Sequence, residues 1–213
     1  MKKTLLLSLV SVLSCSVAFA DTKATVVETI TPVSPWGLEA SVVSVYATGN
    51  FIGNSTKRFN LAGPELTLVY NKNKNHAFTL RGSALYGRHG NAGVDVDGYP
   101  RPLAKLDLML MPGYRYTHSV APRTSVYGGF NVGVVFTDVN KHHHYIINGG
   151  GEESEWGLAA SAELGVRYDI DTNWDVFAAY QLSGDTARPT VDTMGKQRGQ
   201  MYHGFRVGIG HRF

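Results

Sequence analysis

The sequence is poor in cysteine, in charge and in long apolar runs, and each shortage excludes a class of protein. Only one cysteine is present, which excludes a structural disulfide within the chain. Charged residues make up 17%, below the roughly 25% that is usual for soluble domains. The formal net charge of +3 is too small to indicate a nucleic-acid partner, which favours a strongly basic face. Beyond residue 20, no apolar run approaches the about 20 residues of a membrane-spanning helix.

The first 20 residues have the pattern of a secretory signal peptide. Two lysines precede the apolar run Leu5–Val12, and the tripeptide A-F-A at residues 18–20 matches an A-x-A cleavage site. We expect cleavage after Ala20, which removes Cys15 and with it any thiol catalysis. The cleaved chain then has 18 basic residues (20 less the two lysines) and 17 acidic residues, a net charge of +1. The alternative is cleavage before Cys15, because residues 12–15 loosely resemble a lipoprotein signal.

From residue 36 to the end, apolar side chains recur at every second position in eight segments. In residues 104–117, for example, Leu106, Leu108 and Leu110 alternate with Asp107 and Met109. Because successive side chains of a strand point to opposite faces, this pattern predicts strands with one apolar and one polar face. The sequence lacks sustained 3.6-residue periodicity, which excludes helices outside the leader. The eight predicted strands are residues 36–47, 59–71, 76–88, 104–117, 124–139, 155–170, 174–183 and 201–213.

The connections between these segments alternate between long and short. The short ones are polar turns, and the long ones contain glycine, asparagine or aspartate. Antiparallel strands joined in chain order form a meander whose short turns all lie at one end. We therefore expect an all-β, eight-stranded antiparallel up-and-down barrel over residues 36–213, preceded by an N-terminal periplasmic lead-in at 21–35. The short turns are residues 71–75, 118–123 and 171–173, and the long connections are 48–58, 89–103, 140–154 and 184–199.

The strand face opposite the apolar one collects charges of both signs in equal number. Isolated ions inside a barrel would each cost several kcal/mol, whereas opposed ions with satisfied hydrogen bonds are tolerated. Matched charges therefore indicate a charge-paired interior and an apolar face that meets lipid. The alternative is a soluble lipid carrier, which would hold the apolar face inside. The ten charged residues are Glu39, Glu65, Asp107, Glu163, Asp175, Arg81, Arg115, Arg167, Arg206 and Arg212.

Aromatic residues near the strand ends favour the membrane orientation. Trp36 and Tyr46 lie ten residues apart, and Trp156 and Tyr168 lie twelve apart. At about 3.3 Å per residue and a tilt near about 40°, each pair spans roughly 25–30 Å, close to the height of the apolar band of an outer-membrane barrel. Aromatic girdles, with short periplasmic turns on one side and long loops on the other, are typical of such barrels.

This pattern resembles the eight-stranded outer-membrane barrel family represented by the OmpA transmembrane domain and the OmpX-type proteins. The resemblance covers residues 36–213, and its most specific element is the alternating final strand that ends in Phe213. That strand resembles the signal read by the outer-membrane insertion machinery. Because the sequence ends at this strand, the peptidoglycan-binding domain of OmpA is not expected here.

The resemblance implies a bacterial outer-membrane location, reached through a cleaved signal peptide, with lipid and lipopolysaccharide as surroundings. It further implies a non-enzymatic surface, envelope-integrity or adhesion-type protein whose extracellular loops can meet an outside partner. No cofactor and no nucleic acid are expected.

The lumen of such a barrel admits two interpretations. Eight strands leave an interior just wide enough for side chains to fill, so we expect the paired charges to hold the barrel shut. The alternative is a small passive channel for ions or solutes. Inward glycines would either make room for the arginines or leave space for water; they are Gly113, Gly133, Gly165, Gly208 and Gly210.

Three other features of the sequence are candidate functional sites. In the run of three histidines at 142–144, only His142 and His144 would share a strand face, and two ligands do not complete a zinc site. A lipid A-modifying enzyme, the least favoured function, needs serine, histidine and an acid held together. His203 and His211 have no serine two residues away. The Asn148-Gly149 pair suits a hairpin turn that would extend its flanking strands beyond the membrane, and a mobile loop is the alternative.

Overall fold

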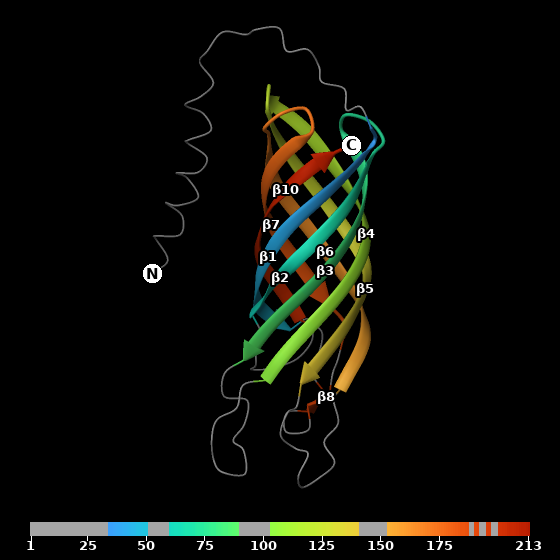
Figure 1. Cartoon of the computed structure of the whole chain (residues 1–213). Coiled ribbons are helices and arrows are strands. Elements are labelled where there is room, and N and C mark those ends of the chain that lie inside the picture. Colours follow the sequence, from blue (N-terminus) through green and yellow to red (C-terminus); the bar gives the residue numbers. More distant parts are fainter. Residues whose placement is uncertain are drawn as a thin grey trace, which may run out of the picture. The chain divides into compact units, whose positions relative to one another are not determined.

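The chain forms a closed barrel of eight long antiparallel strands, each bonded to the next in chain order and the last to the first (Figure 1). The predicted fold class is thus confirmed. The computed structural model describes residues 34–50, 60–89, 103–140, 153–187, 190–191, 195–196 and 200–213. Within these ranges, no helix is long and apolar enough to cross a membrane. The long strands are β1 (Trp36–Asn50), β2 (Asn60–Asn71), β3 (His76–His89), β4 (Leu103–Ala121), β5 (Thr124–Asn140), β6 (Glu153–Asp169), β7 (Trp174–Asp185) and β10 (Gln200–Arg212).

Several strands extend beyond their predicted ends. Strand β4 continues to Ala121, where Ala121 pairs with Thr124 across a tight Pro-Arg turn, so most of the predicted 118–123 connection is strand. Strand β7 continues to Asp185. The connection expected at 184–199 also contains two short strands, β8 (Thr190–Val191) and β9 (Gly195–Lys196), which pair with each other. Residues 1–33, and with them the signal peptide and Cys15, lie outside the described part of the chain.

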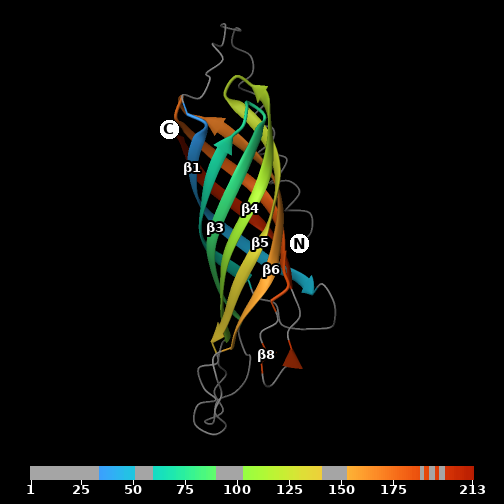
Figure 2. The same ribbon diagram turned by 90° about the vertical axis from the view of Figure 1, so that its right-hand side faces the viewer.

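The two ends of the barrel differ in their connections. The turns after β2, β4 and β6 lie at the same end as the C-terminus, and β8 marks the opposite end (Figures 1 and 2). At the end that carries the turns after β2, β4 and β6, the amide of Phe213 donates to the carbonyl oxygen of Trp36. This bond closes the seam between the first and last strands. We call these two ends the short-turn end and the long-connection end.

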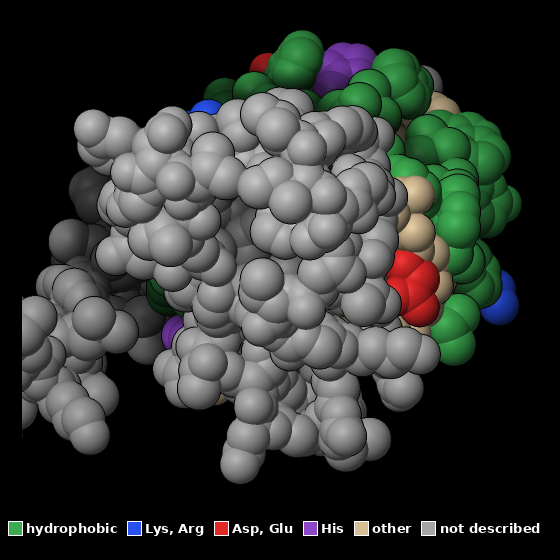
Figure 3. Space-filling view, turned by 90° about the horizontal axis from the view of Figure 1, so that it is seen from below, with side chains coloured by type: hydrophobic (Ala, Val, Ile, Leu, Met, Phe, Trp, Pro, Cys, Tyr) green, Lys and Arg blue, Asp and Glu red, His purple; other side chains and the backbone are tan. Residues whose placement is uncertain are grey.

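The apolar face of every strand points outward. On β10 the side chains of Phe205 and Val207 are 48% and 55% exposed, whereas Arg206 between them is fully buried. Seen from the long-connection end, hydrophobic side chains dominate the part of the outer wall that is in view (Figure 3). A soluble carrier requires the opposite arrangement, so the structure contradicts that alternative.

Aromatic side chains pair across neighbouring strands near both ends of this apolar wall. An aromatic ring with a polar atom is stable where a membrane meets water, so two such girdles mark the limits of an apolar band. The ring pairs, with centroid distances, are Trp36–Tyr70 (4.9 Å), His76–Tyr116 (5.2 Å) and Trp174–His211 (4.5 Å) at the short-turn end, and Phe136–Trp156 (5.2 Å) and Tyr46–His203 (6.2 Å) toward the other.

The turn between β6 and β7 is held by an aspartate side chain. Asp171 Oδ1 accepts hydrogen bonds from the amides of Asn173 and Trp174, each at 2.8 Å. These two hydrogen bonds, of which the one from Asn173 has the larger effect, hold the pKa of Asp171 below its usual value. A carboxylate with a lowered folded-state pKa stabilises the fold above its unfolded-state pKa, and this contribution is lost as the pH falls through the folded-state value.

We therefore expect the amides of Asn173 and Trp174 to report the protonation of Asp171. Acid titration followed by NMR should show both amides shifting together below about pH 4, and Asp171→Asn should remove that step. A common shift of the two amides at the same pH in the variant would contradict the assignment to Asp171.

Candidate functional site: the barrel lumen

The lumen is filled by three layers of side chains, which follow one another along each strand. On β4 the inward positions run from Lys105 and Asp107 through Met109 and Met111, past a glycine, to Arg115. The first two belong to what we call the lysine cluster, the methionines to an apolar layer, and Arg115 to the arginine cluster. The lumen is therefore a packed core in which polar layers enclose an apolar one.

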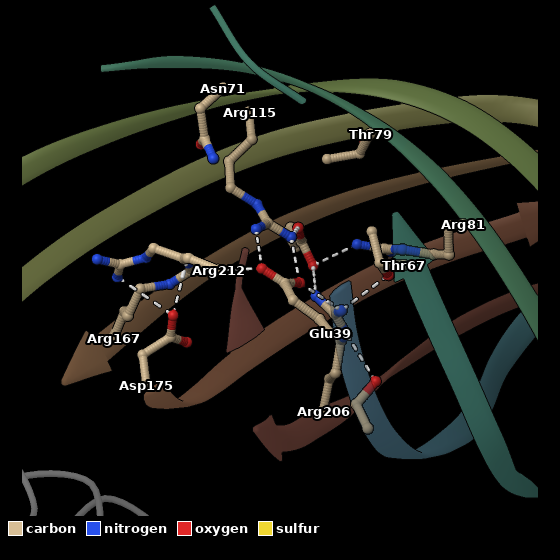
Figure 4. Close-up of polar contacts among 12 residues, drawn as sticks. Glu39, Thr67, Asn71, Thr79, Arg81, Arg115, Arg167, Asp175, Arg206 and Arg212 are labelled. Atoms are coloured by element: carbon tan, nitrogen blue, oxygen red, sulfur yellow. Dashed lines mark hydrogen bonds and ion pairs between the residues drawn. The ribbon is translucent and has the colours of Figure 1, made fainter. Parts of the chain in front are cut away.

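Glu39 is the centre of the arginine cluster (Figure 4). Arg115 donates to both of its oxygens, with Nη1 to Oε1 at 2.5 Å and Nη2 to Oε2 at 2.9 Å. Arg206 Nη2 donates to Oε2 at 3.0 Å, and Arg167 Nη2 donates to Oε1. Glu39 is 2% exposed, so one buried carboxylate holds three guanidinium groups from β4, β6 and β10.

Two further glutamates extend the arginine cluster toward the middle of the barrel. Glu163 Oε2 lies 2.7 Å from Arg81 Nη2 and 3.1 Å from Arg206 Nη1. Glu65 Oε1 lies 2.6 Å from Arg206 Nε and 3.4 Å from Arg81 Nε. Because each arginine bridges two or more carboxylates, the cluster cross-links strands that are not neighbours in the wall.

The outermost part of the arginine cluster lies at the short-turn end. Asp175 Oδ2 lies 3.2 Å from Arg212 Nη2 and 3.4 Å from Arg167 Nη1, and Arg212 also pairs with Asp169. Arg167 and Arg212 side chains are 12% and 20% exposed, against 0% to 2% for the deeper arginines. Five acids and five arginines thus make a neutral cluster that opens to solvent only at its rim.

Aromatic rings inside the barrel carry the arginines on their faces. The guanidinium carbon of Arg115 lies 4.7 Å from the ring centre of Tyr127, and that of Arg206 lies 4.6 Å from Phe177. Each ring faces a glycine: a Cβ on Gly165 would lie 2.6 Å from Tyr127 Cζ, and one on Gly208 would lie 2.6 Å from Phe177 Cζ. These two glycines therefore make room for aromatic rings, where the sequence suggested room for arginines or water.

The remaining inward glycines have other neighbours. A Cβ on Gly113 would lie 2.6 Å from Asn131 Cγ, and one on Gly210 would lie 2.6 Å from Asp175 Oδ1. At Gly133 it would lie 2.7 Å from Met111 Cα on the neighbouring strand. None of these three positions opens the lumen, because each is taken by a neighbouring strand or polar side chain.

The lysine cluster lies at the other side of the apolar layer. Lys105 Nζ lies 2.9 Å from Asp107 Oδ2 and 3.5 Å from Asp185 Oδ2, and it donates to Tyr202 Oη at 2.7 Å. Thr137 Oγ1 donates to Asp107 Oδ1 at 2.8 Å. Asp107 was expected among the arginine-paired acids, but here it is bound by lysine. The charged interior is thus two clusters where the sequence suggested one.

The apolar layer between the clusters is made by inward side chains of six strands and one connection. Val43, Val45 and Val135 are at most 1% exposed, although their strands pass through a charge-lined barrel. Bare ions avoid such a region, because an unpaired charge in apolar surroundings costs far more than one in water. The layer comprises Val43, Val45, Ala47, Leu61, Leu85, Met109, Met111, Val135, Ala159 and Ala187, with the ring of Tyr202 at its edge.

Sequence reasoning placed the ten charged side chains on the face that the structure turns inward, and it missed four partners. Lys105 lies inside the predicted strand 104–117 with the parity of Asp107, and Asp185 lies two positions beyond the predicted strand 174–183 with the parity of Asp175, so the alternation itself indicated both. Asp169 pairs with Arg212 and has the same parity as Arg167. Tyr127 was assigned to the inner face, but its contact with two arginines has no signal in the sequence.

His203 and His211, the candidate histidines for enzymatic chemistry, lie on the outer wall. His203 contacts the rings of Tyr46 and Tyr180, and His211 contacts those of Trp174 and Phe213. Within the described ranges, no group of three or more His, Cys, Asp or Glu side chains could hold a metal ion. The histidines at 142–144 and the Asn148-Gly149 pair lie outside those ranges.

Comparison with known proteins identifies the fold. No family model matches the sequence, and no curated protein sequence matches it significantly. Neisserial surface protein A aligns with a TM-score of 0.57 and 14% identity, over 84% of this chain and 98% of that chain. Outer membrane protein OprG of Pseudomonas aeruginosa aligns with a TM-score of 0.50 and 13% identity, over 86% of this chain and 98% of that chain. The chain therefore has the fold of small outer-membrane β-barrels, which confirms the resemblance at the level of fold.

Proposed function

We propose that this protein is a non-conducting bacterial outer-membrane barrel that presents its long connections at the cell surface, in an adhesion-type or envelope-integrity role. The observation that carries the proposal is the filled lumen. Two ion-paired clusters enclose an apolar layer, so the barrel acts as a rigid support. What remains variable on such a support is the set of long connections at one end.

The outer wall supports the membrane location. Between the two girdles, charged side chains are absent from the outward positions that the structure describes, and the apolar band they leave suits a bilayer. The fold shared with Neisserial surface protein A and with OprG supports the same location. By analogy with barrels of this kind, the short turns face the periplasm and the long connections face outward.

The alternative function, a small channel, makes a different prediction in planar-bilayer recordings. We expect the inserted protein to show no steady conductance, because the apolar layer offers an ion no compensating partner. Neutralising Arg81 or Glu163 should leave the recordings unchanged.

The same preparation must be shown to contain folded barrel. The control is gel electrophoresis, in which a folded barrel that resists detergent migrates differently before and after boiling. A steady conductance that changes in Arg81→Gln or Glu163→Gln would establish a path through the arginine cluster and would overturn the closed-lumen proposal.

A further inference from the structure

Two neighbouring turns at the short-turn end carry exposed basic side chains. Lys72 and Lys74 lie in the turn between β2 and β3, and Arg123 lies in the turn between β4 and β5. The first turn is fastened to β4, the strand that leads into the second: the amide of Thr117 donates to the carbonyl of Asn75 at 2.7 Å, and Asn75 Nδ2 donates to the carbonyl of Thr117 at 2.9 Å. We call these three cations, together with the tip of the β4–β5 hairpin, the basic sector.

Acidic side chains described at this end of the barrel are already engaged elsewhere. Asp169, whose amide bonds the carbonyl of Arg123, directs its carboxylate to Arg212, as does Asp175. Asp171 holds the β6–β7 turn through the amides of its own turn. The three cations of the basic sector make no ion pair with a described acid, so their charge is available to an anion from outside.

The depth of the basic sector is set by the aromatic girdle next to it. On the outer face of β4, Tyr114 and Tyr116 are followed two residues later by His118 and then by Val120. The His76 ring packs against both tyrosines at 5.9 and 5.2 Å. One outward step along a strand is about 7 Å, so His118 lies one step beyond the ring layer and Val120 lies two steps beyond it, on the side of the lipid headgroups.

The hairpin tip is partly apolar as well as basic. Val120 is 55% exposed, and Ala121 and Pro122 beside it are also exposed. Apolar side chains flanked by His118 and Arg123 suit the headgroup region of a membrane, where a cation reaches the phosphate.

We propose that the basic sector binds the phosphate of an anionic phospholipid headgroup in the leaflet that surrounds the short-turn end. Lys72, Lys74 and Arg123 supply the charge, and the hairpin tip supplies the apolar contact. The β6–β7 turn, which follows the β4–β5 turn around the same end, carries an exposed aspartate in place of the cations, so anionic lipid is favoured only beside the basic sector. This inference rests on the proposed insertion of the barrel in a membrane.

The test records the electron spin resonance spectrum of spin-labelled lipids in bilayers of dimyristoylphosphatidylcholine that contain the refolded protein. The motionally restricted fraction of the spectrum reports lipid in contact with the barrel, and we compare labelled phosphatidylglycerol with labelled phosphatidylcholine. A cation near the headgroups favours an anionic lipid by about fivefold at the position it touches. Averaged over the whole lipid shell, we expect phosphatidylglycerol to be preferred by about twofold at low salt.

The triple variant K72Q/K74Q/R123Q should reduce this preference to about one, and K72R/K74R should retain it. Arg88 provides the matched control. It is an exposed arginine at the long-connection end that is bonded to Tyr86, so R88Q should leave the preference unchanged while R123Q lowers it. High salt should abolish the preference, because exposed charges are screened.

The outcomes separate this inference from the proposed function. If no restricted lipid component is present for either label, the barrel is not inserted and the membrane proposal fails. If restricted lipid is present but wild type and K72Q/K74Q/R123Q show the same preference, the basic sector has no lipid role. Equal losses in R88Q and R123Q would also overturn the inference, because any exposed cation would then suffice.

Discussion

Glu39→Gln is expected to lower the free energy of unfolding by about 3–5 kcal/mol, the cost of breaking a buried ion pair by removing one partner. Glu39 holds Arg115, Arg167 and Arg206, and all three enter the barrel from other strands. An amide keeps the shape of the carboxylate but removes its charge. The variant therefore leaves one positive charge uncompensated in the arginine cluster, most of which is shut off from water.

Urea unfolding of the barrel in detergent micelles, followed by tryptophan fluorescence, measures this effect. The double variant E39Q/R167Q restores equal numbers of both signs in the arginine cluster, and Asp175 keeps Arg212 as its partner. We expect the double variant to recover part of the stability lost in Glu39→Gln. An unfolding free energy for Glu39→Gln within about 1 kcal/mol of the wild type would contradict the central role of Glu39, because that is the size of an exposed ion pair.

Gly208→Ala is expected to destabilise the barrel by about 3 kcal/mol, at the upper end of the cost of overpacking. A Cβ at this position would collide with the carbonyl oxygen of Ala40 and would lie 2.6 Å from Phe177 Cζ. The first contact is with backbone of the neighbouring strand at the closing seam, which cannot move without breaking the ladder. The second displaces the ring on which Arg206 stacks.

Gly82→Ala is the matched control for this prediction. It makes the same chemical change in a strand of the same barrel, but no atom lies within 4 Å of the added Cβ. We expect Gly82→Ala to be neutral or slightly stabilising, because alanine reduces the freedom of the unfolded chain. Equal destabilisation by the two variants would show that loss of glycine itself, and not the close approach at Gly208, determines the effect.

The filled lumen explains how a barrel of this size can hold a stable shape with so many buried charges. Removing one partner of a buried ion pair is costly, but the arginine cluster as a whole is neutral and each of its arginines is paired with carboxylates. Each arginine pairs with carboxylates on different strands. The cluster therefore holds the strands on opposite sides of the lumen at set distances, and it also balances the buried charge. A rigid wall of this kind suits a protein that functions through the connections it carries.

The alternation of side chains in the sequence was sufficient for the fold. Period-two patterning fixed the number of strands, the face on which each charge lies and the alternation of short and long connections, because each depends only on neighbours along the chain. The same parity placed Arg206 and Arg212 inside and Phe205 outside. Strand ends were harder to place, as at Ala121, where the turn geometry and not the apolar pattern extends the strand.

Partners across the lumen were decided by the tertiary structure alone. Glu39 and Arg115 are 76 residues apart, and the tilt of the strands and the stagger of their pairing set the level at which two inward side chains meet. The parity of a residue in its strand does not give its height along the barrel axis. Parity alone therefore grouped Asp107 with the arginines, although in the barrel Asp107 lies at the height of Lys105. The apolar layer also depends on the tertiary structure. Val43, Leu85 and Val135 do not stand out in their own strands, and they block the lumen only because the folded barrel places them at the same height.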